Sequence, residues 1–492
     1  MELLLLILTI LLWIFLGVLA IGFVLLIAAL VRAMLIKEKV PVSEAEPNDS
    51  VSQAHGERLS TLVEIKTVAE KSQEDYSAFD YFHKRLEKLF PHVHQNMERR
   101  VFPDRTLMFH WKGKADVDPV VFMAHHDVVD ADEASWDVSP FSKTIKDKQI
   151  YGRGTFDTKC TLYAFFQAAE ELIEEGFIPH RDIFFVSSSN EELSGTGAKQ
   201  PAEWFKKNNI KPFLVLDEGG AIVRDALPTL TTPIALIGVL EKGYANITFT
   251  AKSHGGHSST PPKHTPIARL ADFVHDVEQH FPLKTKMIPE VRELLVTAAP
   301  RMGFLYRLLF GNVWLFKPLI TRLLPAMSPY GRALFSTTVA FTMAEGSDAE
   351  NVIPAEANVV ANLRIHPIQN SKESFAVLKR IAEKYDIVAT LTDYRDAKKK
   401  VSTDSEAYRF VKHAIKTVFP DVSVSPYMIF GSTDARHYQD VSDAALRFSP
   451  IVISNDDLKK MHGDNESLPL ASLTKAVWFY KYLMKNTGGN DT

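Results

Sequence analysis

The chain has 492 residues, a hydrophobic content of 46% and a formal net charge of −4. These values are typical of an ordinary globular protein and exclude a disordered chain. Because there is no basic excess, nucleic acid is not expected as a partner. The single cysteine, Cys160, excludes an intramolecular disulfide framework. At this length we expect two domains, or one domain with a large insertion.

The N-terminal segment differs from the rest of the chain. Residues 3–31 carry no charge and consist mainly of Leu, Ile, Val and Phe, which is long enough to cross a bilayer as a helix. We therefore expect residues 1–35 to be a single-pass transmembrane anchor. The alternative is a signal peptide cleaved after "GVLA" at Ala20, which would give a secreted protein. Basic residues follow the segment and favour a cytoplasmic catalytic part by the positive-inside rule, but the side of the membrane stays open.

Residues 36–58 are rich in Pro, Ser, Asp and Glu, which predicts a solvated tether. Helix and strand patterns alternate after it. "SAFDYFHKRLEKLF" and "TLYAFFQAAEELIEEG" have helical spacing of apolar residues, the second ending at Gly176, whereas "VVFMAHHD", "RDIFFVSSSNEE" and "KPFLVLDEGG" begin as short apolar strands. This order predicts an α/β fold with a mainly parallel sheet flanked by helices.

Ionisable residues follow these apolar strands at the point where each strand ends. They are His125 and Asp127 after the first strand, Glu191 and Glu192 after the second, Asp217 at the end of the third, and Asp157 in the loop "YGRGTFDTKC". In open α/β sheets, sites form outside the carboxyl ends of the strands. Carboxylates gathered there would repel one another and raise each other's pKa. The pattern therefore predicts a divalent metal ion, or a pair of them.

The spacing within each pair indicates a division of roles. His125 and Asp127 are two residues apart and share a face of an extended chain, so the carboxylate can hold a ligating imidazole. His126 points the other way and is predicted to be packed or solvated. Glu191 and Glu192 are adjacent and diverge, so one can bind metal while the other faces the substrate water.

Eight motifs occur in one order along the chain after the tether. They are "MAHHDVV", "YGRGTFDTKC", "SSSNEELSG", "LDEGG", "GGHSSTPP", "NVIPAEANVVANLRIHP", "GSTDARHY" and "MHGDNES". The set resembles the dizinc metallopeptidases that include carboxypeptidase S, aminoacylase-1 and succinyl-diaminopimelate desuccinylase. Within that family, residues 312–343 are most similar to the branch of N-fatty-acyl-amino-acid synthase/hydrolases.

The resemblance implies a role for each site residue. His125 and Asp217 would hold one zinc ion, Glu192 and His462 the other, and Asp157 would bridge both; Asp127 would orient His125, and Glu191 would be the general base. Two Zn²⁺ are therefore expected as cofactors. The choice of zinc rests on the resemblance, because carboxylate and imidazole ligands also suit Co²⁺ and Mn²⁺. Cys160 is expected to be a buried, inert thiol.

The resemblance also implies a second domain inserted into the first. Residues 59–243 and 367–488 would form the catalytic domain, and residues 244–366 an α+β lid or dimerisation domain. His257 would stabilise the tetrahedral oxyanion, often in the partner subunit's site, which makes a homodimer possible. The implied substrate-binding residues are Asn351, Arg364, Gly431, Ser432 and Thr433, with the guanidinium of Arg364 suited to a terminal carboxylate.

A hydrophobic insertion at about residues 300–335 is dense in Leu and Phe, with basic residues among them. Three interpretations stay open. The segment could lie on a membrane surface, it could line an acyl pocket with Leu308, Phe310 and Trp314, or it could be a helical insertion packed on the lid.

These expectations converge on a membrane-anchored, zinc-dependent hydrolase. It would cleave the amide bond of an N-acyl amino acid or of a small peptide with a free carboxylate. A carboxypeptidase or dipeptidase acting on plain peptides is the alternative with the same chemistry. An inactive membrane-anchored scaffold with a metallopeptidase fold is the alternative from another class, and the complete set of acidic and imidazole residues favours the enzyme.

Overall fold

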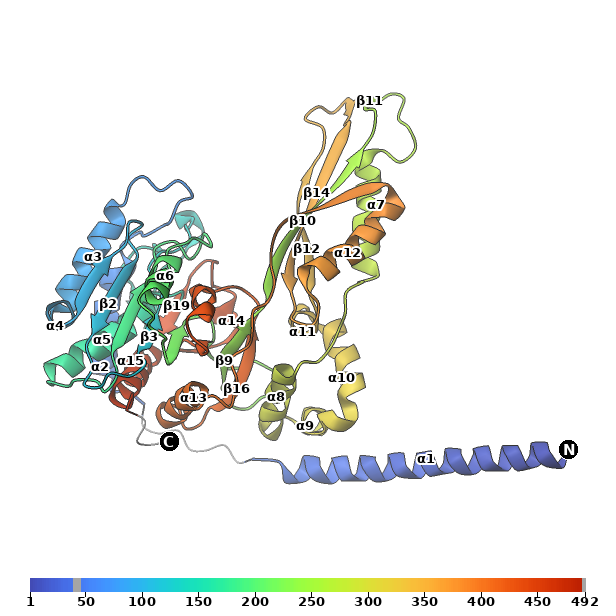
Figure 1. Ribbon diagram of the computed structural model, residues 1–492, viewed down its shortest axis with the longest axis horizontal. Coiled ribbons are helices and arrows are strands. Elements are labelled where there is room, and N and C mark those ends of the chain that lie inside the picture. The colour runs from blue at the N-terminus through green and yellow to red at the C-terminus, as the bar shows by residue number, and fades with distance from the viewer. Residues whose placement is uncertain (39–45, 489–492) are drawn as a thin grey trace.

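The computed structural model describes residues 1–38 and 46–488. Two lobes stand side by side, and one long helix, α1 (Glu2–Leu35), extends away from them (Figure 1). Among the described residues, α1 is the one helix that is long and apolar enough to cross a membrane. The predicted α/β fold with helices flanking a sheet is confirmed, and the sheet, expected to be mainly parallel, is mixed.

The larger lobe is built on a ten-stranded sheet with the order β1-β2-β6-β3-β7-β17-β9-β8-β18, in which β16 also pairs with β9. Its strands are β1 (Glu98–Val101), β2 (Leu107–Trp111), β3 (Val120–Met123), β6 (Ile183–Ser187), β7 (Leu214–Asp217), β8 (Ile222–Val223), β9 (Ile234–Glu241), β16 (Ser423–Ile429), β17 (Ala445–Arg447) and β18 (Val452–Ile453). The central strands β6, β3, β7 and β17 are parallel, and antiparallel pairs lie toward the edges. A small sheet of β4 (Ile145–Lys146), β5 (Gln149–Tyr151) and β19 (Ser467–Pro469) accompanies it.

Helices cover both faces of the large sheet, which explains why its central strands are apolar throughout. In β3, Val120 and Phe122 face one hydrophobic core, and Val121 and Met123 face another. The helices of this lobe are α2 (Asp49–Val63), α3 (Ser77–Leu89), α4 (Pro91–Asn96), α5 (Lys159–Glu174), α6 (Lys199–Lys207), α13 (Glu406–Val418), α14 (Asn455–Leu458) and α15 (Leu470–Lys485).

Helix α2 corrects the predicted tether, which was expected to continue to residue 58. Asn48 caps the helix by accepting a hydrogen bond from Ser50 N at 2.8 Å. The helix packs against α15 so closely that a Cβ atom on Gly56 would lie 2.4 Å from Leu470 Cδ2. Its first turns bury small and polar residues, so the apolar spacing that marks an amphipathic helix is missing. Residues 39–45 of the predicted tether lie outside the described residues.

The smaller lobe, called the lid below, has its own sheet and core. The sheet has the order β12-β14-β10-β15, formed by β12 (Thr338–Glu345), β14 (Glu356–Ile365), β10 (Gly243–Lys252) and β15 (Ile387–Arg395), and it is covered by α7 (Pro266–Gln279) and α12 (Ser371–Ala382). The short pair β11 (Gly256–His257) and β13 (Val352–Ile353) lies at its tip (Figure 1). Because β15 pairs with β10, the lid continues well past the predicted boundary at residue 366.

The hydrophobic insertion forms the helices α8 (Pro289–Ala298), α9 (Phe304–Gly311), α10 (Val313–Met327) and α11 (Pro329–Phe335). Helix α8 packs on β16 of the large sheet. Phe310, Val313 and Ile320 belong to the core of the large lobe, and none of these helices contributes a buried residue to the lid core. The buried apolar residues of the insertion therefore join the main core, and α11 also contacts the predicted lid, where Lys286 N donates to Phe335 O at 2.8 Å.

Candidate metal centre and active site

The structure brings four of the five predicted metal ligands together beyond the carboxyl ends of β3 and β6: His125, Asp157, Glu192 and His462. The Nε2 atom of His125 lies 3.1 Å from Asp157 Oδ1, and the Nε2 atom of His462 lies 3.1 Å from Asp157 Oδ2. The same atom of His462 lies 3.0 Å from Glu192 Oε2. Ligand atoms of His125, Asp157 and Glu192 all fall within 4.8 Å of one another. Asp157 thus lies between the two imidazoles, with one of its oxygens near each.

Asp127 contacts both His125 and the turn that carries Glu191 and Glu192. It is fully buried, and its Oδ1 lies 3.4 Å from His125 Nδ1, which also lies 2.9 Å from the Asp127 carbonyl oxygen. Its two carboxylate oxygens accept the backbone N–H groups of Glu191 at 3.1 Å and Glu192 at 3.0 Å. One carboxylate therefore fixes both the imidazole and the turn that carries the two glutamates.

Negative charge is crowded around Glu191. Burial, followed by repulsion from Asp434, raises the pKa of Glu191 well above its ordinary value, although Arg436 Nη1 lies 3.4 Å from its Oε1. Burial likewise raises the pKa of Asp434 to about 7. The mixture of imidazole and carboxylate donors, with more acidic than basic groups, fits a first-row divalent metal.

Asp217 has a neighbour that sequence reasoning missed. The two carboxylate oxygens of Asp217 accept backbone N–H groups, from Glu218 at 2.9 Å and from Ala435 at 2.6 Å. Burial raises the pKa of Glu218 well above its ordinary value, and repulsion from Asp157, Asp217 and Glu191 adds to the effect. Glu218 is therefore a further acidic residue near the cluster. The only sequence signal was its place in "LDEGG".

His462 is the most exposed member of the cluster, with 52% of its side chain accessible. Hydrogen bonds to Asp157 and Glu192 raise its pKa to about 10. It follows α14 in the chain, with a φ of +59°. It lies next to Asp157, and its role as a zinc ligand stays a prediction.

Glu466 is a second residue that sequence reasoning missed. It is fully buried, and its carboxylate accepts the backbone N–H groups of Phe156 at 2.7 Å, Asp157 at 3.1 Å and Gly154 at 3.1 Å. Arg153 Nη1 donates to it at 2.8 Å. The whole loop that presents Asp157 is thus held by one carboxylate, four residues after His462.

The predicted substrate-binding residues divide into two groups. Arg364 lies on β14 with its guanidinium 5.6 Å from the centre of the Tyr244 ring. Ser432 accepts a hydrogen bond from Arg395 Nη2, and Thr433 Oγ1 donates to Glu241 Oε1 at 2.7 Å. Burial and then the positive charges of Arg436 and Arg364 lower the pKa of Arg395. The three guanidinium groups therefore lie near one another where the lid meets the large lobe.

Gly431 precedes Ser432 in the same loop and has open space where a Cβ would lie. His257 and Asn351, in contrast, lie at the tip of the lid, which is remote from the large sheet (Figure 1). Asn351 O accepts a hydrogen bond from Ser258 N at 3.0 Å, which keeps this pair of loops together. The structure does not bring His257 or Asn351 to the metal ligands of its own chain.

Two predicted bystanders are buried and packed. His126 is stacked on Phe82 with ring centroids 5.2 Å apart, and its Nδ1 lies 2.8 Å from Ser187 Oγ. Burial raises the pKa of Cys160 to about 12, and its Sγ donates to Phe156 O at 3.3 Å. A thiol in this state is inert.

The fold and the site define a metal-dependent hydrolase. The sequence profile of peptidase family M20/M25/M40 matches residues 121–486, and the chain belongs to this family. It is 33% identical to probable carboxypeptidase S-like 2 from Dictyostelium discoideum, over 88% of this chain and 84% of that protein. It is also 33% identical to the N-fatty-acyl-amino acid synthase/hydrolase PM20D1 from Homo sapiens, over 87% of each chain.

Solved structures show the same fold. An M20 family metallo-carboxypeptidase from Sulfolobus solfataricus superposes with a TM-score of 0.61 at 18% identity, covering 87% of this chain and 97% of that one. Human carnosine dipeptidase 1 superposes with a TM-score of 0.60 at 14% identity, covering 89% and 99%. The predicted family, the fold class and the hydrolase activity are confirmed.

Proposed function

We propose that the protein hydrolyses the amide bond of N-acyl amino acids or small peptides that carry a free carboxylate, with two zinc ions. The observation that carries this proposal is the position of Asp157 between His125 and His462, each 3.1 Å from one of its oxygens. Relatives named as N-fatty-acyl-amino acid synthase/hydrolases and as carboxypeptidases support the two substrate types.

His125, Asp157, Glu192 and His462 would hold the metal pair, together with Asp217 or Glu218. When bound, the pair supplies Lewis-acid polarisation of the scissile carbonyl and lowers the pKa of water. We favour Glu218 over Asp217, because both oxygens of Asp217 already accept backbone N–H groups. With both oxygens bonded to backbone N–H groups, the Asp217 carboxylate would hold the backbone at Glu218 in place rather than bind the metal.

Glu191 would take a proton from the attacking water and deliver it to the leaving nitrogen. Asp127 fixes the backbone of Glu191 by accepting its N–H group. The carboxylate of Glu191 lies 3.4 Å from Arg436 Nη1, so Glu191 would take up and release the proton next to a positive charge. His257, with Asn351, would complete the oxyanion site of a second subunit in a homodimer, since neither reaches the metal ligands of its own chain.

The substrate carboxylate would be held by the guanidinium groups of Arg364 and Arg395. Ser432 supports Arg395 by accepting its hydrogen bond. We further propose that α1 is a retained membrane anchor rather than a cleaved signal, because its C-terminal part packs on α9.

The test is amino-acid release by the zinc-loaded full chain in detergent, offered N-oleoyl-phenylalanine and Gly-Leu in parallel. A preference for the acylated substrate supports the N-acyl-amino-acid activity, and a preference for Gly-Leu supports the carboxypeptidase alternative. Glu191→Gln is the matched control, since it should bind zinc and turn over neither. Turnover by Glu191→Gln equal to wild type would refute the mechanism.

A further inference from the structure

The C-terminal third of α1 is docked on the hydrophobic insertion. Ala29 and Ala33 are fully buried against it. Asn312 Nδ2 donates to Ala29 O at 3.0 Å, and Arg307 Nε donates to Ala33 O at 2.7 Å. These bonds fix α9 and the start of α10 beside the end of α1 (Figure 1).

The undocked part of α1 has the length of a membrane core. Every residue from 3 to 24 is exposed. These residues span roughly 33 Å at about 1.5 Å per residue, against a hydrocarbon thickness of about 30 Å. If this part of α1 crosses a bilayer, the bilayer surface falls where α9 and α10 begin.

Large apolar side chains are exposed on these two helices. The exposed fractions are 63% for Leu305, 51% for Trp314, 44% for Leu319 and 43% for both Phe304 and Leu323. Such a patch is unfavourable in water. At the polar edge of a bilayer, apolar and indole side chains are favoured.

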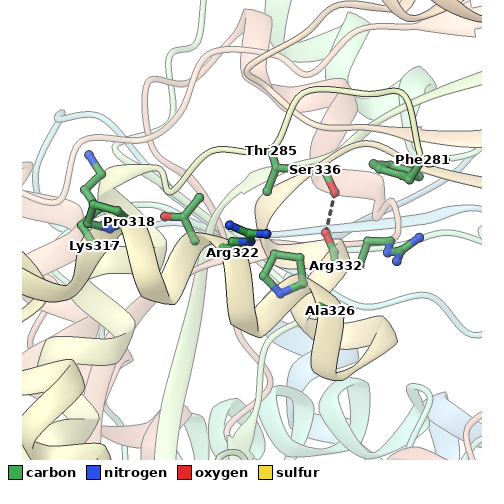
Figure 2. Close-up of a pocket in the computed structure, with 10 residues that line it drawn as sticks. Phe281, Thr285, Lys317, Pro318, Arg322, Ala326, Arg332 and Ser336 are labelled. Carbon is green, nitrogen blue, oxygen red and sulfur yellow. Dashed lines mark hydrogen bonds between the residues drawn. The ribbon is translucent and has the colours of Figure 1, made fainter.

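Cations accompany the apolar patch. A cavity of about 570 Å³ lies between α10, α11 and the segment before α8. Figure 2 shows Lys317, Arg322 and Arg332 around it, and Arg332 lies over the Phe281 ring at 4.8 Å. Across residues 1–38 and 46–488, no carboxylate forms an ion pair with any of these three cations. The rest of the lining includes apolar groups such as Pro318 and Pro325.

We propose that α9, α10 and α11 form a platform that lies in the surface of the bilayer crossed by α1. The exposed apolar side chains enter the interface, and the cationic cavity seats the phosphate of a membrane phospholipid. This inference rests on the proposed anchor. It would place the enzyme against the membrane on which acylated substrates collect, with the orientation fixed by α1 and the platform together. Leu308, Phe310 and Trp314 are not among the residues that line this cavity, and their role in an acyl pocket stays a prediction.

The test uses the full chain in vesicles of phosphatidylcholine and phosphatidylglycerol. The native Cys160 is buried, so a nitroxide can be attached to a single introduced cysteine at Leu305 or Leu323. Ile178, which is 49% exposed on the large lobe, is the matched control site. We expect the labels on the platform to be reached by oxygen dissolved in lipid and shielded from a water-soluble nickel relaxant, and the label at Ile178 to behave in the opposite way.

Failure of the anchor and failure of the platform give different results. Protein released from the vesicles by alkaline carbonate would overturn the anchor. Protein retained by the vesicles, but with labels at Leu305 and Leu323 as accessible to nickel as the label at Ile178, would overturn the platform while the anchor stands.

The phosphate seat is tested by the preference of the protein for spin-labelled phosphatidylglycerol over phosphatidylcholine. One basic side chain at an anionic surface is worth about fivefold in affinity. Lys317→Glu with Arg322→Glu should therefore reduce the preference by at least about fivefold. The control pair, Lys206→Glu with Lys207→Glu at the end of α6, should leave it unchanged. An equal loss in both pairs, or no loss in either, would overturn the seat.

Discussion

The substitution Glu466→Gln tests whether one buried carboxylate holds the loop that presents Asp157. The carboxylate accepts three backbone N–H groups and the guanidinium of Arg153, all at 2.7–3.1 Å. A glutamine keeps the shape, but its amide nitrogen cannot accept, so the donors on that side lose their partner.

The magnitude follows from the burial of the pair. Removing one partner of a buried ion pair costs about 3–5 kcal/mol. Burial raises the pKa of Glu466, because removal from water disfavours its charged form. We therefore expect a loss of about 3 kcal/mol, at the lower end of that range. Because Asp157 is no longer fixed, zinc affinity should also fall by about 10- to 100-fold, as is typical when a supporting group of a metal site is lost.

Two measurements on the same preparation separate these effects: thermal unfolding of the metal-free protein and zinc competition with a chromophoric chelator. The matched control is Glu175→Gln, a surface carboxylate that faces Lys481 at 2.6 Å and should change neither quantity. Unchanged zinc affinity with reduced stability would show that Glu466 supports the fold but not the site. Unchanged stability and affinity would refute the reasoning altogether.

Three further outcomes are expected. Glu191→Gln should keep its zinc content by elemental analysis and lose about 10²- to 10⁴-fold in kcat, the usual share of a general base; a small loss would assign the base elsewhere. Glu218→Gln should lower zinc affinity more than Asp217→Asn does in the chelator assay, and the reverse order would restore Asp217 as the ligand. Burial lowers the pKa of Lys242 to about 7 from 10.5, so between these values the unfolded state binds more protons and stability rises with pH. From pH 7 to 9, wild type should gain about 2 kcal/mol over Lys242→Met in denaturant unfolding, and parallel curves would contradict this.

The sequence predicted best those features that depend on local order. Apolar strands that end in ionisable residues placed His125, Asp127 and Asp217 at one edge of a sheet, because parallel strands end together. The pairing of residues far apart in sequence was less accessible. His462 reaches Asp157 across about 300 residues, and the family resemblance, rather than its spacing, indicated it.

The features that were missed share a physical cause. Glu466 and Glu218 lie outside helices, and Arg395 is the last residue of a strand. No periodicity reveals their positions, since a charged residue usually lies in solvent. The helix α2 was missed because its first turns bury Gly56 and polar neighbours rather than a stripe of large apolar residues. Tertiary packing, and not local preference, decides these positions.

The guanidinium groups at the lobe boundary suggest how a substrate carboxylate would act on the contact between the two lobes. Arg364 and Arg395 belong to the lid strands β14 and β15, whereas Arg436 belongs to the large lobe. Burial, followed by repulsion from Arg436, lowers the pKa of Arg395. A substrate carboxylate placed between these groups would replace that repulsion with attraction, so its binding should stabilise the contact between the two lobes.

This coupling predicts a difference between two ligands that differ in one group. Phenylalanine should raise the Tm of the full chain, by an amount that corresponds to about 2.7 kcal/mol at 100 times its Kd. Phenylalanine amide, which lacks the carboxylate, should not. The stabilisation should be lost in Arg395→Ala, since Arg364 alone would then face the anion across the boundary. Equal stabilisation by the acid and the amide would show that the side chain, and not the carboxylate, is what the boundary between the two lobes recognises.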